Sequence, residues 1–134
     1  MEAARALVAR YYASFDAGDI EGMLDCLSDD VAHHVNEGAI RVGKPAFAEF
    51  CAHMNRCYRE RLTDIVVMAS PDGARAAAEF TVNGTYLETD AGLPEASGQT
   101  YVLPAGGFFS IEDGRISRVV TYYNLADWVR QVSA

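Results

Sequence analysis

The sequence lacks the features that define several large classes of protein. Its 134 residues contain no apolar run long enough to span a membrane. The opening residues, MEAARALVAR, lack the apolar block and cleavage site of a signal peptide. No linker, internal repeat or low-complexity segment interrupts the chain. We therefore expect a single domain over residues 1–134 that is cytoplasmic and has no membrane partner.

Positive charge and metal-ligand motifs are also scarce. The chain has 11 Lys and Arg against 19 Asp and Glu, a net charge of −8, so it repels phosphate backbones and is not expected to bind nucleic acid. Cys26, Cys51 and Cys57 have no CxxC spacing and are expected to be free, buried thiols. His33, His34 and His53 lack the spacing of a metal site. No glycine-rich phosphate loop is visible, so we expect neither a metal nor another cofactor.

What the sequence has is apolar periodicity, first with the spacing of helices. Residues 3–16 place apolar side chains at steps of three and four, and Asp19 can cap a second helix. A third helix is predicted to begin at Gly43-Lys44-Pro45, because proline is favoured in a first turn. A short strand, Val31–Asn36, lies between the second and third helices. Residues 125–132 predict a closing helix.

After Arg61 the period changes to that of strands. Strands are predicted over residues 62–69, 74–88, 99–111 and 115–124, and the last three are long. Within residues 74–88, Ala76, Ala78 and Phe80 fall on one face and Glu79 on the other. Helices segregated from consecutive strands predict an α+β fold. A long, strongly bent antiparallel sheet wrapped by three helices, with a short C-terminal helix, would form a cone whose mouth is a ligand pocket.

Three strings carry a family resemblance: "RYYASFDAGDIEGM", "DDVAHHVNEG" and "IEDGRISRVVTYYNLADWVRQV". Their order resembles the superfamily that includes nuclear transport factor 2, ketosteroid isomerase and the SnoaL-like polyketide cyclases. The resemblance covers essentially the whole chain. Within the superfamily, the chain is similar to ketosteroid isomerase-related proteins of unassigned activity. It implies a cone-shaped α+β roll. It implies no single activity, since this fold hosts isomerases, cyclases, hydrolases and non-catalytic binders.

The family's catalytic groups carry over only in part. Ketosteroid isomerase uses a carboxylate base, and a tyrosine and a protonated aspartate as its oxyanion hole. Tyr11 matches that tyrosine. The base position falls at Val35 and the second acid at Gly106, and neither side chain can transfer a proton. The acid of the resembling cyclases falls at Asn124, whose amide can orient a ligand but cannot act as a base.

The remaining polar residues supply alternatives. His34 and Asn36 share one face of the first strand, and His33 and Val35 share the other. We predict His34 as the replacement base, Tyr11 as an oxyanion donor, and Asn36, Tyr86, Tyr101 and Asn124 as ligand-binding residues. The opposing interpretation is that both histidines lie at a wet strand edge. Glu79 is a weaker candidate base.

The resulting hypothesis is a small-molecule pocket protein, an isomerase- or cyclase-like enzyme that transfers a proton next to a carbonyl. Its partner would be a hydrophobic polyketide- or steroid-like ligand. The alternative is a non-catalytic ligand-binding or dimerisation module that has lost the family acids, and epoxide hydrolysis is a third possibility. A homodimer is also expected, through an outer sheet face exposing Val119, Thr121 and Tyr123.

Overall fold

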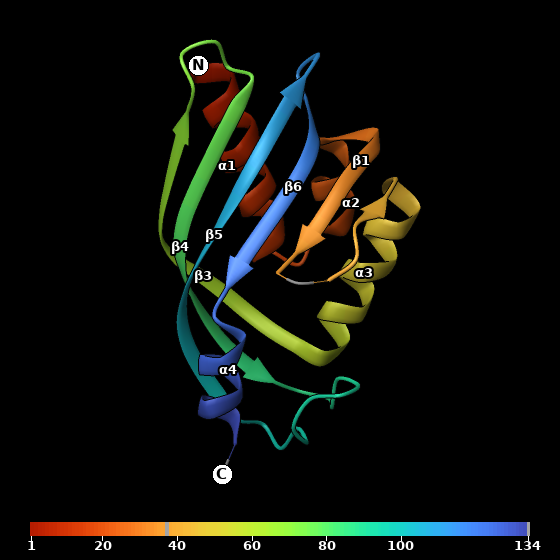
Figure 1. The fold of residues 1–134 in the computed structure, drawn as a ribbon, viewed down its shortest axis with the longest axis vertical. Coiled ribbons are helices and arrows are strands. Elements are labelled where there is room, and N and C mark those ends of the chain that lie inside the picture. Colours follow the sequence, from red (N-terminus) through yellow and green to blue (C-terminus); the bar gives the residue numbers. More distant parts are fainter. Residues whose placement is uncertain (37, 134) are drawn as a thin grey trace.

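The chain forms a strongly curved sheet with helices on one face (Figure 1). The structure is a computed structural model that describes residues 1–36 and 38–133. Its elements are α1 (Glu2–Asp16), α2 (Ile20–Asp25), β1 (Leu27–Val35), β2 (Arg41–Val42), α3 (Lys44–Cys57), β3 (Tyr58–Ala69), β4 (Arg75–Tyr86), β5 (Thr100–Glu112), β6 (Arg115–Tyr123) and α4 (Leu125–Val132).

The six strands follow the order β2-β1-β6-β5-β4-β3. Strands β3 to β6 form the predicted antiparallel meander. The expectation of a purely antiparallel sheet is wrong at one place, because β1 pairs with β6 in parallel. After β1 and β2, the chain forms α3 on the concave face and then the four strands of the meander. The last of these, β6, lies beside β1 and runs in the same direction. The predicted α+β class is confirmed.

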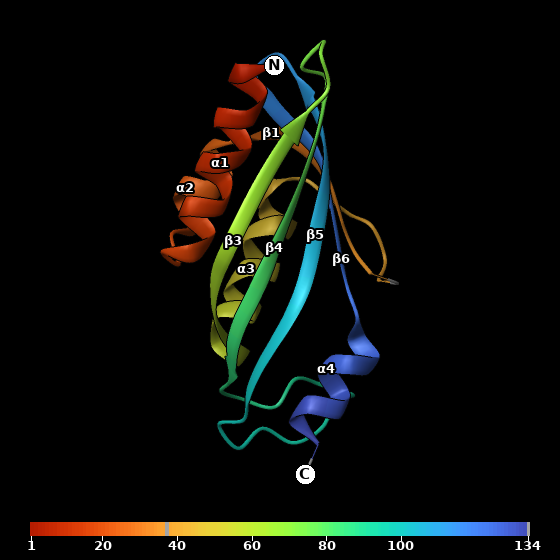
Figure 2. The same ribbon diagram turned by 90° about the vertical axis from the view of Figure 1, so that its left-hand side faces the viewer.

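Helices α1, α2 and α3 lie on the concave face, and the opposite face carries no helix over most of its height (Figure 2). Local chemistry fixes where the helices begin. Asp19 caps α2 by accepting a hydrogen bond from the Gly22 amide at 3.0 Å, and Asn124 caps α4 through the Asp127 amide at 2.9 Å. Pro45 lies in the first turn of α3, as predicted.

Strand β3 begins earlier than the sequence suggests. Helix α3 ends at Cys57, and β3 starts at Tyr58 without a turn, four residues before the predicted start at Leu62. Residues 58–61 pair with residues 83–86 of β4, so cross-strand hydrogen bonds override a local pattern that is too polar to read as a strand. This early start determines the direction of the side chain at position 60.

The core lies between α1 and the concave face. Leu7, Val8, Tyr11 and Tyr12 of α1 are buried, and so are the predicted inward residues of β4, from Ala76 to Tyr86. Burial of each large apolar side chain contributes about 1.5–3 kcal/mol. The three cysteines are free and buried, as expected. In the part of the chain that the structure describes, no helix combines the length and hydropathy needed to cross a membrane.

Candidate functional site

A cavity opens between the helices and the concave face of the sheet. It encloses about 1040 Å³ of empty space, counted out to its solvent-open mouth. Most of its wall is apolar and aromatic, and comes from α1, α2, α3, α4 and strands β3, β4 and β5: Phe15, Met23, Phe47, Phe50, Leu62, Phe80, Leu103 and Trp128. Such a lining favours a hydrophobic guest.

One carboxyl group interrupts this apolar wall. Glu60 of β3 lines the cavity, and the Tyr101 hydroxyl of β5 donates a hydrogen bond to its Oε2 at 2.6 Å. The two residues are two strands apart, and both pair with Gly84 of β4. A Cβ on Gly84 would lie 2.2 Å from the Tyr101 ring. The missing side chain of Gly84 therefore lets the Tyr101 ring cross β4 and reach Glu60.

Burial changes the acid–base properties of this pair. Desolvation raises the pKa of Glu60, and the hydrogen bond from Tyr101 partly opposes that rise. Desolvation is also the main cause of the raised pKa of Tyr101, to which the Glu60 carboxylate adds. Tyr101 therefore stays protonated as a donor. Glu60 is the type of group expected for general acid–base chemistry, since burial raises its pKa in the direction of neutral pH.

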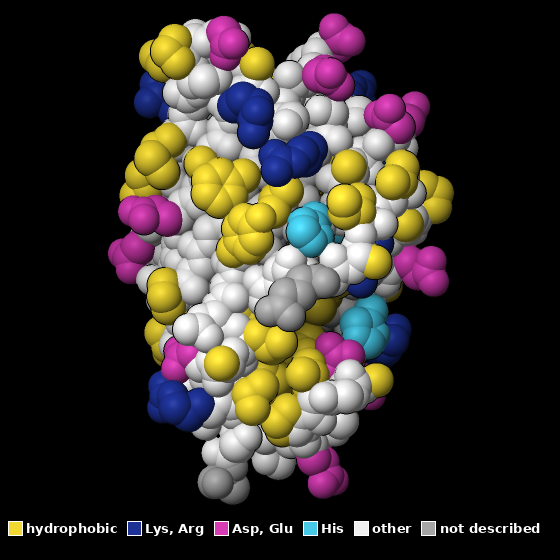
Figure 3. All heavy atoms as spheres, viewed as in Figure 1, with side chains coloured by type: hydrophobic (Ala, Val, Ile, Leu, Met, Phe, Trp, Pro, Cys, Tyr) yellow, Lys and Arg dark blue, Asp and Glu magenta, His cyan; other side chains and the backbone are white. Residues whose placement is uncertain are grey.

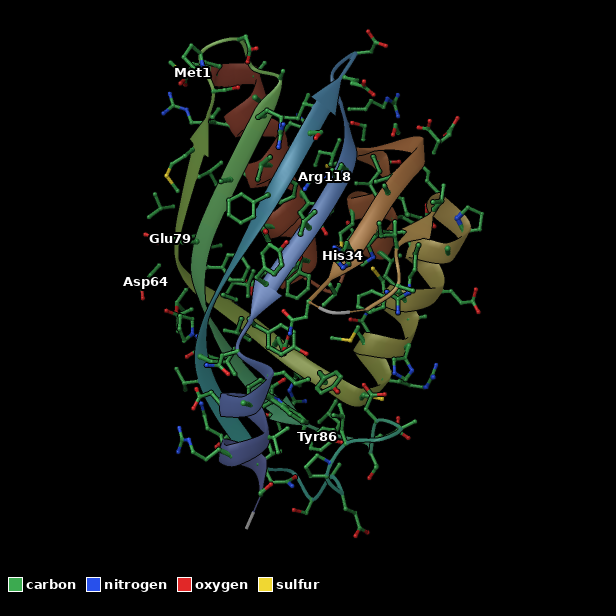
Figure 4. The ribbon with its side chains drawn as sticks, in the orientation of Figure 1. Met1, His34, Asp64, Glu79, Tyr86 and Arg118 are labelled. Carbon is green, nitrogen blue, oxygen red and sulfur yellow. The ribbon has the colours of Figure 1, made fainter. Side chains whose placement is uncertain are left out.

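The predicted direction of the two adjacent histidines is wrong. His33 is 3% exposed and lines the cavity, whereas His34 lies on the opposite, outer face of β1 (Figure 4). Side chains alternate along a strand, so only one of the two can point inward. The helices cover the face that carries His33 and Val35. His34 therefore has no access to a ligand in this cavity.

His33 is a buried imidazole in aromatic surroundings. Its ring centroid lies 4.6 Å from that of Phe47 and 4.8 Å from that of Phe50, and its Nδ1 atom is buried without a partner among the described residues. Desolvation lowers the pKa of His33 to about 4, with a smaller contribution from the positive charge of Arg41. His33 is therefore neutral at pH 7, and its Nδ1 atom can donate or accept one hydrogen bond with a ligand, depending on the tautomer.

Two tyrosines of α1 complete the polar groups near the helix side of the cavity. Tyr11, predicted as a donor, lines the cavity, and desolvation raises its pKa well above the ordinary value. The Tyr12 hydroxyl is buried without a partner among the described residues and lies against β5, where a Cβ on Gly107 would be 2.5 Å away. Both hydroxyls remain protonated at neutral pH and are candidate donors to a ligand oxygen.

Three of the predicted binding residues serve the fold and are absent from the cavity wall. Asn36, with φ of 47°, accepts a hydrogen bond from the Tyr123 amide at 2.9 Å and fastens the end of β1 to β6. The Tyr86 hydroxyl donates to the Pro94 carbonyl at 2.6 Å and accepts from the Asp90 amide at 2.9 Å. Asn124 is the exposed cap of α4. Backbone amides occupy the Oδ1 atoms of both asparagines, and backbone groups occupy the Tyr86 hydroxyl.

Of the six predicted site residues, the cavity therefore brings together Tyr11 and Tyr101. Sequence reasoning missed Glu60 and His33. Glu79, the acid that it weighed, is exposed on the outer face (Figure 4). The sequence holds no clear signal for Glu60, because the alternation of Tyr58, Glu60 and Leu62 with exposed residues appears only once this segment pairs with β4 as a strand.

The chain belongs to the SnoaL-like domain family, whose model matches residues 8–119. A crystal structure of a "putative polyketide cyclase" from Silicibacter sp. TM1040 is 65% identical, with a TM-score of 0.97, over 100% of this chain and 98% of that one. A similarly named structure from Pseudomonas putida KT2440 is 62% identical, with a TM-score of 0.96, over 97% and 98% of the two chains. A third, from Xanthomonas campestris pv. campestris, is 52% identical, with a TM-score of 0.95, over 98% of each. A search of curated proteins found no match.

Proposed function

We propose that this protein is an enzyme that binds a hydrophobic carbonyl compound, such as a polyketide- or steroid-like ring, and transfers a proton next to the carbonyl. The observation that carries the proposal is the cavity-lining Glu60, held by Tyr101 and raised in pKa by burial. The names of the three similar structures are consistent with it. Here Glu60 takes the role that His34 was expected to have.

The proposed chemistry follows from the positions of the polar groups. Tyr101 occupies Oε2 of Glu60, which leaves Oε1 to remove a proton from the carbon beside the carbonyl. The electron pair moves to the carbonyl oxygen and gives an enolate. Tyr11 and neutral His33 are the candidate donors to that oxygen. In a β,γ-unsaturated ketone, return of the proton from Glu60 to the γ carbon moves the double bond into conjugation. In a compound with a second carbonyl, attack of the enolate carbon on that carbonyl closes a ring, and the new alkoxide takes the proton from Glu60.

The main alternative is a ligand-binding protein without catalysis. A cavity wall made only of apolar and amide groups would favour it, and the ionisable pair of Glu60 and His33 disfavours it. Epoxide hydrolysis by an Asp-Arg-Asp set fits less well. The described residues of the cavity wall include neither arginine nor aspartate.

The proposal is tested by exchange of carbon-bound hydrogen for deuterium. Cyclic ketones and 1,3-diketones are incubated with the protein in D2O, and loss of the proton signal beside the carbonyl is followed by NMR. Glu60→Gln should slow the exchange by about 10²-fold or more, the usual contribution of a general base. Glu79→Gln is the matched control, because Glu79 is exposed outside the cavity.

Two results would count against the enzyme. Wild-type rates in Glu60→Gln would remove the carboxylate from the mechanism. Ketones that bind, as judged by calorimetry, but that exchange no faster than in buffer would favour the binding-protein alternative.

We also propose that the protein forms a homodimer through the outer face of the sheet. The residues first expected there do not support it, because Val119 is fully buried and Thr121 and Tyr123 line the cavity. The outer face exposes other apolar groups: Val66, Met68, Val102, Phe108 and Tyr122. Hydrophobic side chains gather at the centre of this face (Figure 3). The Phe108 and Tyr122 ring centroids lie 6.0 Å apart. An apolar patch of this kind is typical of a protein interface.

A further inference from the structure

A second group of reactive side chains lies outside the cavity wall, at the C-terminal end of α3. His53 and Cys57 are four residues apart and share one face of the helix. The loop between β4 and β5 passes beneath this end of α3 (Figure 1) and presents Asp90 to the same face. The three side chains place one ligand atom each within 4.8 Å of one another.

The three groups converge on a single nitrogen. His53 Nε2 lies 2.8 Å from Asp90 Oδ1 and 3.9 Å from Cys57 Sγ. A nucleophilic triad would place the thiol and the carboxylate on different ring nitrogens, so that one proton can pass through the imidazole. Here both face the same nitrogen. That arrangement suits an ion shared by the three atoms rather than a proton relay.

A tetrahedral zinc ion would need the imidazole and the carboxylate to move slightly apart and the thiol to move slightly closer. With Zn–N near 2.0–2.1 Å, Zn–O near 2.0–2.2 Å and Zn–S near 2.3 Å, the nitrogen and oxygen lie about 3.4 Å apart and the sulfur about 3.6 Å from each. The observed spacings of 2.8 and 3.9 Å differ from these values by amounts that small side-chain rotations can supply. One thiolate, one imidazole and one carboxylate is a donor set that zinc accepts.

The surroundings hold Asp90 in place. The Tyr58 hydroxyl donates to Asp90 Oδ2 at 2.7 Å, and the Tyr86 hydroxyl accepts from the Asp90 amide. A hydrogen bond to the second oxygen of a carboxylate ligand is common in metal sites. The Arg56 guanidinium lies 3.2 Å from His53 Nδ1. It would have to move when that nitrogen carries a proton, and Arg56 is exposed and free to do so.

We propose that His53, Cys57 and Asp90 form a zinc-binding site that ties the end of α3 to the loop before β5. The fourth coordination position is open to solvent, since His53 and Asp90 are partly exposed. The site departs from the sequence expectation of no metal, which considered the cysteines and the histidines as separate sets. The relevant signal is the spacing of His53 and Cys57, one helical turn apart.

The test uses the full chain, reduced and freed of metal by a chelator. Zinc should bind with one ion per chain and micromolar or tighter affinity in calorimetry. Cobalt(II) should give the thiolate charge-transfer band and the visible d–d bands of a tetrahedral site. Cys57→Ala should abolish the charge-transfer band, and Asp90→Asn should weaken zinc binding at least tenfold. Cys26→Ala and His34→Gln are the matched controls, because both residues lie far along the chain from the cluster and outside it.

Two outcomes would overturn the proposal: no stoichiometric zinc binding, or a charge-transfer band that survives in Cys57→Ala. Circular dichroism of each variant separates loss of metal from loss of fold. None of the three ligands is used in the proposed proton transfer. The site can therefore fail without affecting the proposed function, and the reverse also holds.

Discussion

The two faces of the sheet carry similar residues in different surroundings. His33 and His34 are neighbours on β1, yet the first is buried among aromatic rings and the second faces outward. Tyr123 and Tyr122 divide in the same way on β6: Tyr123 lines the cavity, and Tyr122 is 48% exposed. Burial on the concave face gives ordinary residues unusual proton affinities. Position relative to the helices therefore decides which of two identical side chains can do chemistry.

The largest expected effect concerns the histidine pair. The pKa of His33 is about 4 in the folded chain, against 6.5 ordinarily, so the unfolded chain binds more protons between these values. The free energy of unfolding should therefore fall as pH decreases from about 6.5 to about 4, by about 3 kcal/mol from this group. His33→Gln should flatten that slope in urea unfolding measured across this pH range.

His34→Gln is the matched variant for this measurement. It leaves His33 buried and should keep most of the slope. A slope that persists in His33→Gln and disappears in His34→Gln would reverse the assignment of the two faces.

The next effect concerns the glycine beneath Tyr101. Gly84→Ala places a methyl group in the space that the Tyr101 ring occupies and should cost about 1–3 kcal/mol of unfolding free energy. It should also break the hydrogen bond to Glu60 and reduce the deuterium exchange of ketones. Gly106→Ala, on β5, brings its methyl group only to 3.1 Å from the Ala78 carbonyl and should cost less. Equal losses in the two variants would mean that Tyr101 needs no special space.

A smaller effect is expected at the residues that serve the fold. Asn124→Ala removes the side-chain cap of α4 and should lower the free energy of unfolding by about 1 kcal/mol. Asn124→Ser can still cap the helix and should retain most of that stability. Neither variant should change the affinity for a cavity ligand measured by calorimetry. A large loss of affinity in Asn124→Ser would return this residue to the binding site.

The smallest effect on folding is expected on the outer face. Tyr122→Glu should leave the unfolding free energy of the chain within about 0.5 kcal/mol, because surface substitutions are usually neutral. The same change should shift sedimentation from dimer to monomer, since it places a charge in the apolar patch. Glu79→Gln is a control on the same face. A wild-type chain that sediments as a monomer at high micromolar concentration would contradict the proposed dimer.

Much of the fold could be read from the sequence, and less of the candidate site. The stripe of α1, the inward face of β4 and the meander follow directly from apolar periodicity. Tyr11 was found through the family resemblance, and Tyr101 because tyrosines on predicted strands either fill the core or line the cavity. Glu60 was missed because "YRER" has no apolar pattern, and only pairing with β4 makes it a strand. The direct junction of α3 and β3 is therefore set by tertiary contacts with β4.

The sequence by itself determined which residues share a face. Alternation along a strand places His33 with Val35, and His34 with Asn36, whatever the rest of the chain does. Only the tertiary structure decided which of those faces is inside, because that depends on the side of the sheet that the helices cover. For β4 the apolar face settles the matter locally. For β1 both faces are mixed, so packing of α3 against the strand made the choice, and with it the choice of His33 over His34.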